Sequence, residues 1–180
     1  TYSDYLGELD RRPEEIDRLL DTITINVTKF YRNPETWSWL ERNLLQALVS
    51  ARRGRVRVWS AGCASGEEPY SIAVLFAETM GRDAFRDRVK IYATDVDEEE
   101  LTVARAATYS DRETDGLPAE LRERYFEHVG DKWVFAKDLR RCVIFGRHDL
   151  LSDAPISRVD LLLCRNTLMY FHREAQGRIV

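Results

Sequence analysis

Apolar residues near the start of the chain recur at the spacing of amphipathic helices. Pro13 and the two glutamates after it suit the first turn of a helix. A second helix is predicted from about Pro34 toward Gly54. Its apolar positions fall on one face, and they are Trp37, Leu40, Leu44 and Leu48. We therefore expect residues 1–53 to form an N-terminal helical segment, with TINVTKFYRN as an irregular stretch between its helices.

From residue 54 onward, short apolar segments alternate with helical ones. Segments with the composition of strands cover 55–60, 89–94, 141–145 and 159–164. Helices are predicted over 67–80 and 97–106 and from residue 173, whereas 107–131 is expected to hold short helices and loops before a small strand at 132–136. Alternating strands and helices predict an α/β fold with a parallel sheet. Ligands of such sheets bind beyond the carboxyl ends of the strands.

Composition narrows the range of functions. Hydrophobic residues make up 44% of the chain, enough for a packed core, and the net charge is -4. A mildly acidic chain has no general attraction to nucleic acid or anionic membranes, although a local basic patch stays open. No apolar stretch approaches the ~20 residues of a membrane helix, and TYSDYLGELD is not expected to be a signal peptide. Cys63, Cys142 and Cys164 lack metal-ligand spacing, so we expect a cytoplasmic protein without bound metal.

A glycine-rich turn, AGCASGEEPYS, follows the first predicted strand. Gly62 and Gly66 would let a ligand approach the backbone, although a tight turn without a ligand gives the same pattern. Glu67 and Glu68 begin the next helix. Their charge would repel a pyrophosphate and attract a ligand with a sulfonium and an ammonium group, such as S-adenosylmethionine.

Polar residues follow the other main strands. A carboxylate at Asp95 can accept hydrogen bonds from both ribose hydroxyls; the alternative is a helix cap, a position that suits Asp97. Farther on, Asp149 could accept an adenine amino group and Leu150 could pack on the ring, or this segment is an ordinary polar loop. His148 receives no role. The polar residues of RNTLMYF would be costly beside a buried strand unless exposed or used, so a reacting group is expected there.

Four segments together resemble the chemotaxis-receptor methyltransferases, which methylate receptor glutamates with S-adenosylmethionine. They are INVTKFYRN, VWSAGCASGEEPYSIA, ATDVD and LLLCRNTLMYF, in that order. The resemblance extends from Thr22 to Phe171. It implies a Rossmann-like S-adenosylmethionine-dependent methyltransferase sheet over 54–180, preceded by the helical segment and incomplete at its C-terminal edge. It departs in length and at Asp149, where Asn is commoner, and the small β insertion by which some members dock on receptor tails is not evident.

Site residues follow from this resemblance by position. The implied cofactor-binding residues are Asn26, Thr28, Arg32, Gly62, Glu67, Asp95, Asp149, Leu150, Arg165 and Asn166. Tyr170 resembles the tyrosine near the transferred methyl, and Arg32 is expected to hold either the substrate carboxylate or that of the cofactor. Tyr170 and Arg32 are therefore the candidate catalytic residues.

The implied reaction is methyl transfer to glutamate carboxylates on cytoplasmic helices of chemoreceptors, giving glutamate methyl esters and S-adenosylhomocysteine. A glutamate of ordinary pKa, about 4.3, is ionised at neutral pH and needs no general base. Two alternatives remain open. One is a nucleotide-binding oxidoreductase, which the acidic pair after the glycine turn disfavours, and the other is a non-catalytic sensor or scaffold that keeps the pocket.

The last predicted strand, 159–164, is expected at an edge of the sheet, because residues 165–180 offer no strand to pair beside it. Long apolar edges act as templates for pairing with another chain, and monomers seldom expose such patches. We therefore expect self-association through this edge, unless residues 172–180 fold back and cover it.

Overall fold

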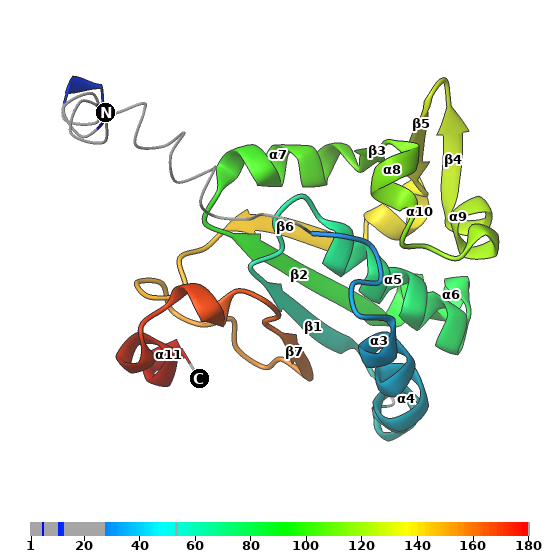
Figure 1. Cartoon of the computed structure of the whole chain (residues 1–180). Coiled ribbons are helices and arrows are strands. Elements are labelled where there is room, and N and C mark those ends of the chain that lie inside the picture. Colours follow the sequence, from blue (N-terminus) through cyan, green and yellow to red (C-terminus); the bar gives the residue numbers. More distant parts are fainter. Residues whose placement is uncertain (1–4, 6–10, 13–27, 53, 180) are drawn as a thin grey trace.

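The structure, a computed structural model, describes residues 28–52 and 54–179 together with Tyr5, Arg11 and Arg12. The helix predicted after Pro13 lies outside the described residues, as does Asn26. In the described part, helices pack on a central parallel sheet, and a smaller antiparallel sheet lies toward one end of it (Figure 1).

The central sheet takes its strands from distant parts of the described sequence. They are β1 (Val56–Ala61), β2 (Val89–Asp95), β6 (Val143–Arg147) and β7 (Leu161–Leu163). All pair in parallel, in the order β6-β2-β1-β7, which confirms the predicted α/β fold. The chain moves outward from β1 through β2 to β6 and then returns to the other side of β1. This reversal creates a switch point at the carboxyl end of β1, where ligands bind in such folds.

The strand predicted over 159–164 is shorter than expected, since β7 covers only Leu161–Leu163, and Asp160 precedes it. The Asp160 carboxylate accepts a hydrogen bond from the Arg57 amide (2.9 Å) and pairs with the Arg52 guanidinium. β7 lies at one edge of the described sheet, and Leu162 is 52% exposed. The predicted edge position of this strand is confirmed.

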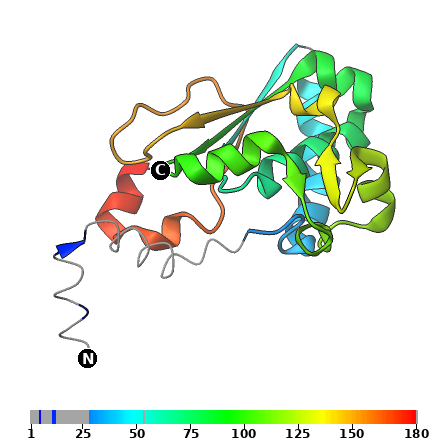
Figure 2. The same ribbon diagram turned by 90° about the horizontal axis from the view of Figure 1, so that it is seen from above.

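The helices that follow β1 and β2 cover one face of the sheet. α5 (Glu67–Met80) and α7 (Glu98–Ala106) lie on the same side of it (Figure 2), and the side chains of α5 from Ile72 to Ala77 are buried. The opposite face is less covered, since Ile144 of β6 is 47% exposed. The shorter helical elements are α6 (Arg82–Arg88), α10 (Lys137–Arg140), the 3-10 turn η2 (Leu168–Tyr170) and α11 (Arg173–Ile179).

The helix predicted from Pro34 forms in three consecutive pieces. They are α3 (Pro34–Leu40), the π-helical turn η1 (Glu41–Leu45) and α4 (Gln46–Ala51). A π-helical turn holds an extra residue compared with an α-helix, so it rotates the positions that follow. The buried side chain is consequently Leu45, at 1% exposure, whereas Leu44 is only partly buried.

An antiparallel sheet interrupts the α/β order between α7 and β6. Its strands β3 (Thr108–Tyr109), β5 (Lys132–Phe135) and β4 (Phe126–Val129) pair in that order, with α8 (Asp111–Thr114) and α9 (Ala119–Tyr125) between β3 and β4. We call residues 108–135 the insert. A small β insertion was not evident in the sequence, yet the structure has an antiparallel sheet here, of which only β5 matches a predicted strand, at 132–136. The sequence concealed it because β3 has two residues and β4 has one buried side chain, Phe126, followed by exposed ones.

Candidate functional site

A pocket of about 390 Å³ lies at the carboxyl ends of the central strands, within the usual size range of small-ligand sites. Nine of the predicted site residues line it: Thr28, Arg32, Gly62, Asp95, Asp149, Leu150, Arg165, Asn166 and Tyr170. The lining residues outside the predicted set are Lys29, Cys63, Ala64, Glu68, Val96, His148, Thr167 and Phe171. The rule that ligands bind beyond strand ends therefore brought together residues that line one pocket.

The glycine turn forms one wall of the pocket. The amides of Gly62 and Cys63 both donate to the carbonyl of Thr94 (2.8 and 3.0 Å), which ties the turn to the end of β2. Gly62 has a φ of 74°, and a Cβ there would lie closer than 3.0 Å to the side chain of Thr167. Glycine is thus required for backbone conformation and for the packing of the segment after β7.

Of the two adjacent glutamates, Glu68 lines the pocket, whereas the sequence predicted Glu67. Glu67 is 3% exposed, is not among the lining residues and accepts the Ser65 hydroxyl at 2.8 Å. Glu68 accepts the Ser60 hydroxyl (2.8 Å) and faces Arg165 at 3.5 Å. Adjacent residues at a helix start point in directions about 100° apart, so only one of the pair can face the pocket.

Burial shifts both carboxyl groups toward the protonated form. It raises the pKa of Glu67 to about 7, against a hydrogen bond from Ser65 that lowers it. It also raises the pKa of Glu68, where Ser60 and Arg165 act in the opposite direction. A cation bound beside Glu68 would favour the ionised form of that carboxyl group.

Asp95 and Asp97 have the separate roles that their spacing suggested. Asp97 caps α7 by accepting the amides of Glu99 and Glu100 (2.8 and 3.2 Å). Asp95 accepts the amide of Ala64 at 2.7 Å with one oxygen and the amide of Asp97 at 3.1 Å with the other. Each carboxylate oxygen has a second lone pair, so Asp95 holds the glycine turn and still has capacity for two ligand hydroxyls.

Polar groups of the loop after β6 form hydrogen bonds within the loop itself. The Asp149 carboxylate accepts the Leu151 amide (2.8 Å) and the Ser152 hydroxyl (2.9 Å), and these hydrogen bonds lower its pKa. His148 lies edge-on to Trp59, and its Nε2 lies 3.1 Å from the carbonyl of Ala154. The carboxylate of Asp149 therefore shapes its own loop, whichever ligand group it also contacts.

A segment before α3 covers the pocket, and we call residues 28–33 the strap. Arg165 holds the strap in place, because its guanidinium donates to the carbonyl of Arg32 (2.6 Å) and to Asn33 Oδ1 (3.0 Å). The same guanidinium lies over the ring of Trp37, 5.1 Å from its centroid. Arg165 thus joins the strap to Glu68 and to the segment after β7.

The rim of the pocket is aromatic and partly exposed. Tyr170 ends the η2 turn and is 51% exposed, and Met169 beside it is 69% exposed. Asn166 adopts a left-handed φ of 59°, which turns the chain directly after β7. Tyr170 is among the residues that line the pocket, whereas its place near the transferred methyl stays a prediction.

The donor set suits a cationic nucleoside ligand. Asp95 offers acceptor sites for ribose hydroxyls, and Val96, Leu150 and Phe171 offer apolar surface. Glu68 offers a partly buried carboxyl group that a bound cation would hold in its ionised form. This combination fits S-adenosylmethionine, whose adenine is apolar on its faces and whose sulfonium and ammonium groups are positive.

A parallel sheet with a switch point and an acidic pocket at its carboxyl edge defines a Rossmann-like ligand-binding domain. Residues 26–180 match the family described as "CheR methyltransferase, SAM binding domain". The chain belongs to this family, and S-adenosylmethionine is the cofactor of its domain. The resemblance seen in the sequence is confirmed.

Curated relatives extend beyond this chain. It is 35% identical over 176 residues to a "Chemotaxis protein methyltransferase" of Listeria innocua, covering 98% of this chain and 66% of the relative. It is 34% identical over 187 residues to "Chemotaxis protein methyltransferase 2" of Pseudomonas aeruginosa, covering 100% of this chain and 65% of the relative. It is 38% identical over 176 residues to an "Uncharacterized 104.1 kDa protein" of Rhodobacter capsulatus, covering 97% of this chain and 18% of the relative. Within the described ranges, no helix has the length and apolar character needed to cross a bilayer.

Proposed function

We propose that this domain transfers a methyl group from S-adenosylmethionine to glutamate side chains of chemotaxis receptors, forming glutamate methyl esters. The observation that carries the proposal is that Glu68 and Asp95 line one pocket at the switch point of the sheet, in a chain of the CheR family. The names of the curated relatives support receptor proteins of chemotaxis as the substrates. Because the substrates would be cytoplasmic helices, a cytoplasmic location is part of the proposal.

When bound, S-adenosylmethionine supplies a methyl group on a positively charged sulfur for transfer to an oxygen nucleophile. In this proposal Glu68 and Asp95 bind and orient that cofactor, and the strap with Thr28 and Arg32 limits the access of water. Excluding water strengthens the electrostatic interactions in the site and prevents side reactions.

No proton has to be removed from the proposed substrate. A glutamate side chain is already ionised at neutral pH, so the site must position it rather than activate it. Among the described residues that line the pocket, the one imidazole is His148, whose Nδ1 is buried without a hydrogen-bond partner. Arg32 is proposed to hold a carboxylate at the pocket, and Tyr170 to lie beside the reacting atoms at its mouth.

Two measurements on the chain test the proposal. Calorimetry should show binding of S-adenosylhomocysteine and none of NAD. Labelled S-adenosylmethionine should then transfer base-labile methyl groups to a cytoplasmic receptor fragment, and a matched fragment with its candidate glutamates changed to glutamine should stay unlabelled. Binding without transfer would replace the proposal with the non-catalytic sensor or scaffold. Binding of NAD instead would point to an oxidoreductase.

A further inference from the structure

The strap packs against the insert through the side chain of Phe30. Thr28, Lys29 and Arg32 line the pocket, but the Phe30 side chain is 1% exposed and buried in the core. Its ring packs edge-to-face on Tyr109 of β3, with centroids 4.9 Å apart, and on Phe126 of β4, at 5.3 Å. Strap residues on both sides of Phe30 therefore line the pocket, while Phe30 itself packs on the antiparallel sheet.

A glycine of the insert brings the two backbones into direct contact. A Cβ on Gly116 would lie closer than 3.0 Å to the carbonyl oxygen of Phe30. The backbone of Gly116 does not have a left-handed φ, so a side chain is excluded there by the strap alone. Because the obstacle is a backbone atom, any larger residue at Gly116 must displace the strap.

The insert also holds the opposite wall of the pocket. The Tyr109 hydroxyl donates to the carbonyl of Ser65 in the glycine turn at 2.8 Å. A Cβ on Gly66 would lie 3.0 Å from the same hydroxyl oxygen, so the turn and the ring are in close contact. Of the described residues that line the pocket, none belongs to the insert, and its influence on the pocket must pass through these contacts.

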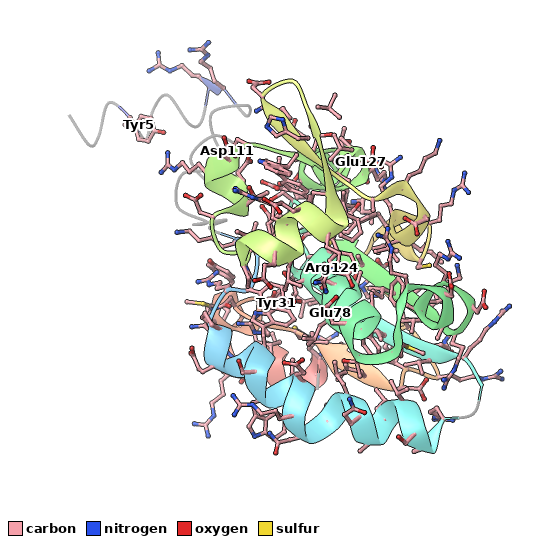
Figure 3. The ribbon with its side chains drawn as sticks, turned by 90° about the vertical axis from the view of Figure 1, so that its right-hand side faces the viewer. Tyr5, Tyr31, Glu78, Asp111, Arg124 and Glu127 are labelled. Atoms are coloured by element: carbon pink, nitrogen blue, oxygen red, sulfur yellow. The ribbon has the colours of Figure 1, made fainter. Side chains whose placement is uncertain are left out.

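The insert is itself fastened to α5, which carries the glycine turn at its start. The Glu78 carboxylate accepts the Arg124 guanidinium (2.8 Å) and the Tyr125 hydroxyl (2.5 Å). Figure 3 shows Arg124 and Glu78 pointing toward each other, with Tyr31 of the strap close by. The Tyr31 amide donates to Ser71 Oγ of α5 at 3.1 Å. Strap, insert and α5 therefore form one connected unit.

We propose that the insert sets the separation of the two pocket walls, with Gly116 positioning the strap and Tyr109 positioning the glycine turn. Both are positioning residues, since neither lines the pocket. The inference rests on the proposed function only in taking the pocket as the cofactor site. It predicts that changing Tyr109 or Gly116 alters cofactor affinity, although neither residue lines the pocket.

The test uses two variants and two matched controls. Tyr109→Phe removes the hydroxyl that bonds Ser65, and Gly116→Ala displaces the strap. Tyr70→Phe removes a hydroxyl with an equally short bond, 2.8 Å to the carbonyl of Ala104 in α7, which is not among the lining residues. Gly54→Ala makes the same glycine substitution where nothing lies within 4 Å.

Calorimetry with S-adenosylhomocysteine should show Kd raised about fivefold or more in Tyr109→Phe and Gly116→Ala, the effect of about one lost hydrogen bond. The two controls should stay within about twofold of the parent chain. Without ligand, hydrogen exchange at the Tyr31 amide should be faster in Gly116→Ala than in Gly54→Ala, because the displaced strap loses its bond to Ser71.

The outcomes separate the two proposals. If the parent chain does not bind S-adenosylhomocysteine, the proposed function fails, and the ligand-free exchange at Tyr31 alone decides the inference. If the parent chain binds, and folded Tyr109→Phe and Gly116→Ala bind equally well, the insert does not position the pocket. If Tyr70→Phe loses as much affinity for S-adenosylhomocysteine as Tyr109→Phe, the positioning role of the insert is also overturned. If Gly116→Ala does not fold, the inference rests on the other pair of variants. A raised Kd in Tyr109→Phe but not in Tyr70→Phe supports it, and equal Kd values overturn it.

Discussion

The buried carboxyl group of Glu67 makes the stability of this chain depend on pH. Burial raises its pKa from the ordinary 4.5 to about 7 in the folded chain. Between these values the folded state holds a proton that the unfolded state has released. The stabilising contribution is therefore complete below about pH 4.5 and is lost as pH rises toward about 7. The difference between the two pKa values corresponds to about 3 kcal/mol in the free energy of unfolding.

Glu67→Gln removes this titration and leaves an acceptor for the Ser65 hydroxyl. Urea unfolding at pH 5 and pH 8 measures the effect, because the change between the two pH values is independent of any fixed cost of the substitution. The parent chain should lose about 2–3 kcal/mol more than Glu67→Gln over this interval. Glu99→Gln, at an exposed position of α7, is the control and should follow the parent chain. Parallel curves for the parent chain and Glu67→Gln would show that Glu67 is already ionised when folded.

Four further outcomes are expected. Asp95→Ala should weaken S-adenosylhomocysteine binding by about 1.5–3 kcal/mol in calorimetry; unchanged affinity with a collapsed Tm would make Asp95 purely structural. Gly62→Ala should lower the free energy of unfolding by about 1–3 kcal/mol, through its left-handed φ and its clash with Thr167; a neutral result in urea would contradict that packing. Tyr170→Phe in a full-length protein should reduce turnover more than cofactor affinity, and equal turnover would remove Tyr170 from the site. The 180-residue chain should self-associate in light scattering, and Leu162→Lys on the edge strand should reduce this; a parent chain that is monomeric at high concentration would refute the edge prediction.

The central sheet was predictable because short apolar, β-branched segments alternate with helices of clear period. The insert was predicted only in part, namely its short helices and the strand at 132–136. Its sheet was missed, because a two-residue strand such as Thr108–Tyr109 has too few positions to show a period. The π-helical turn was hidden for a similar reason, since the choice between Leu44 and Leu45 depends on tertiary packing. Local spacing thus located the long elements and the short strand β5, but missed β3, β4 and the π-helical turn.

Within the site, the rule on strand ends found Asp95 and Arg165, which topology alone brings together. The choice between Glu67 and Glu68 depended on how α5 is rotated against the sheet, and one sequence does not contain that rotation. The carboxylate of Asp149 was expected to serve a ligand, and the structure shows it bonding to its own loop. Short polar side chains often bond the backbone two residues on, a competition that spacing alone does not resolve.

The pairing of β1 with β7 has a consequence for the order in which the molecule assembles. Arg57 and Asp160 are joined by hydrogen bonds across 103 residues of sequence, and the segment that packs on Gly62 follows β7. Contacts so distant in sequence slow the folding of a chain. The pocket is therefore complete only once this long loop has closed, and a nascent chain that lacks β7 has no site to fill. A ligand that binds only the finished pocket stabilises the native state increasingly as its concentration rises, so bound cofactor would also stabilise the pairing of β7 with β1.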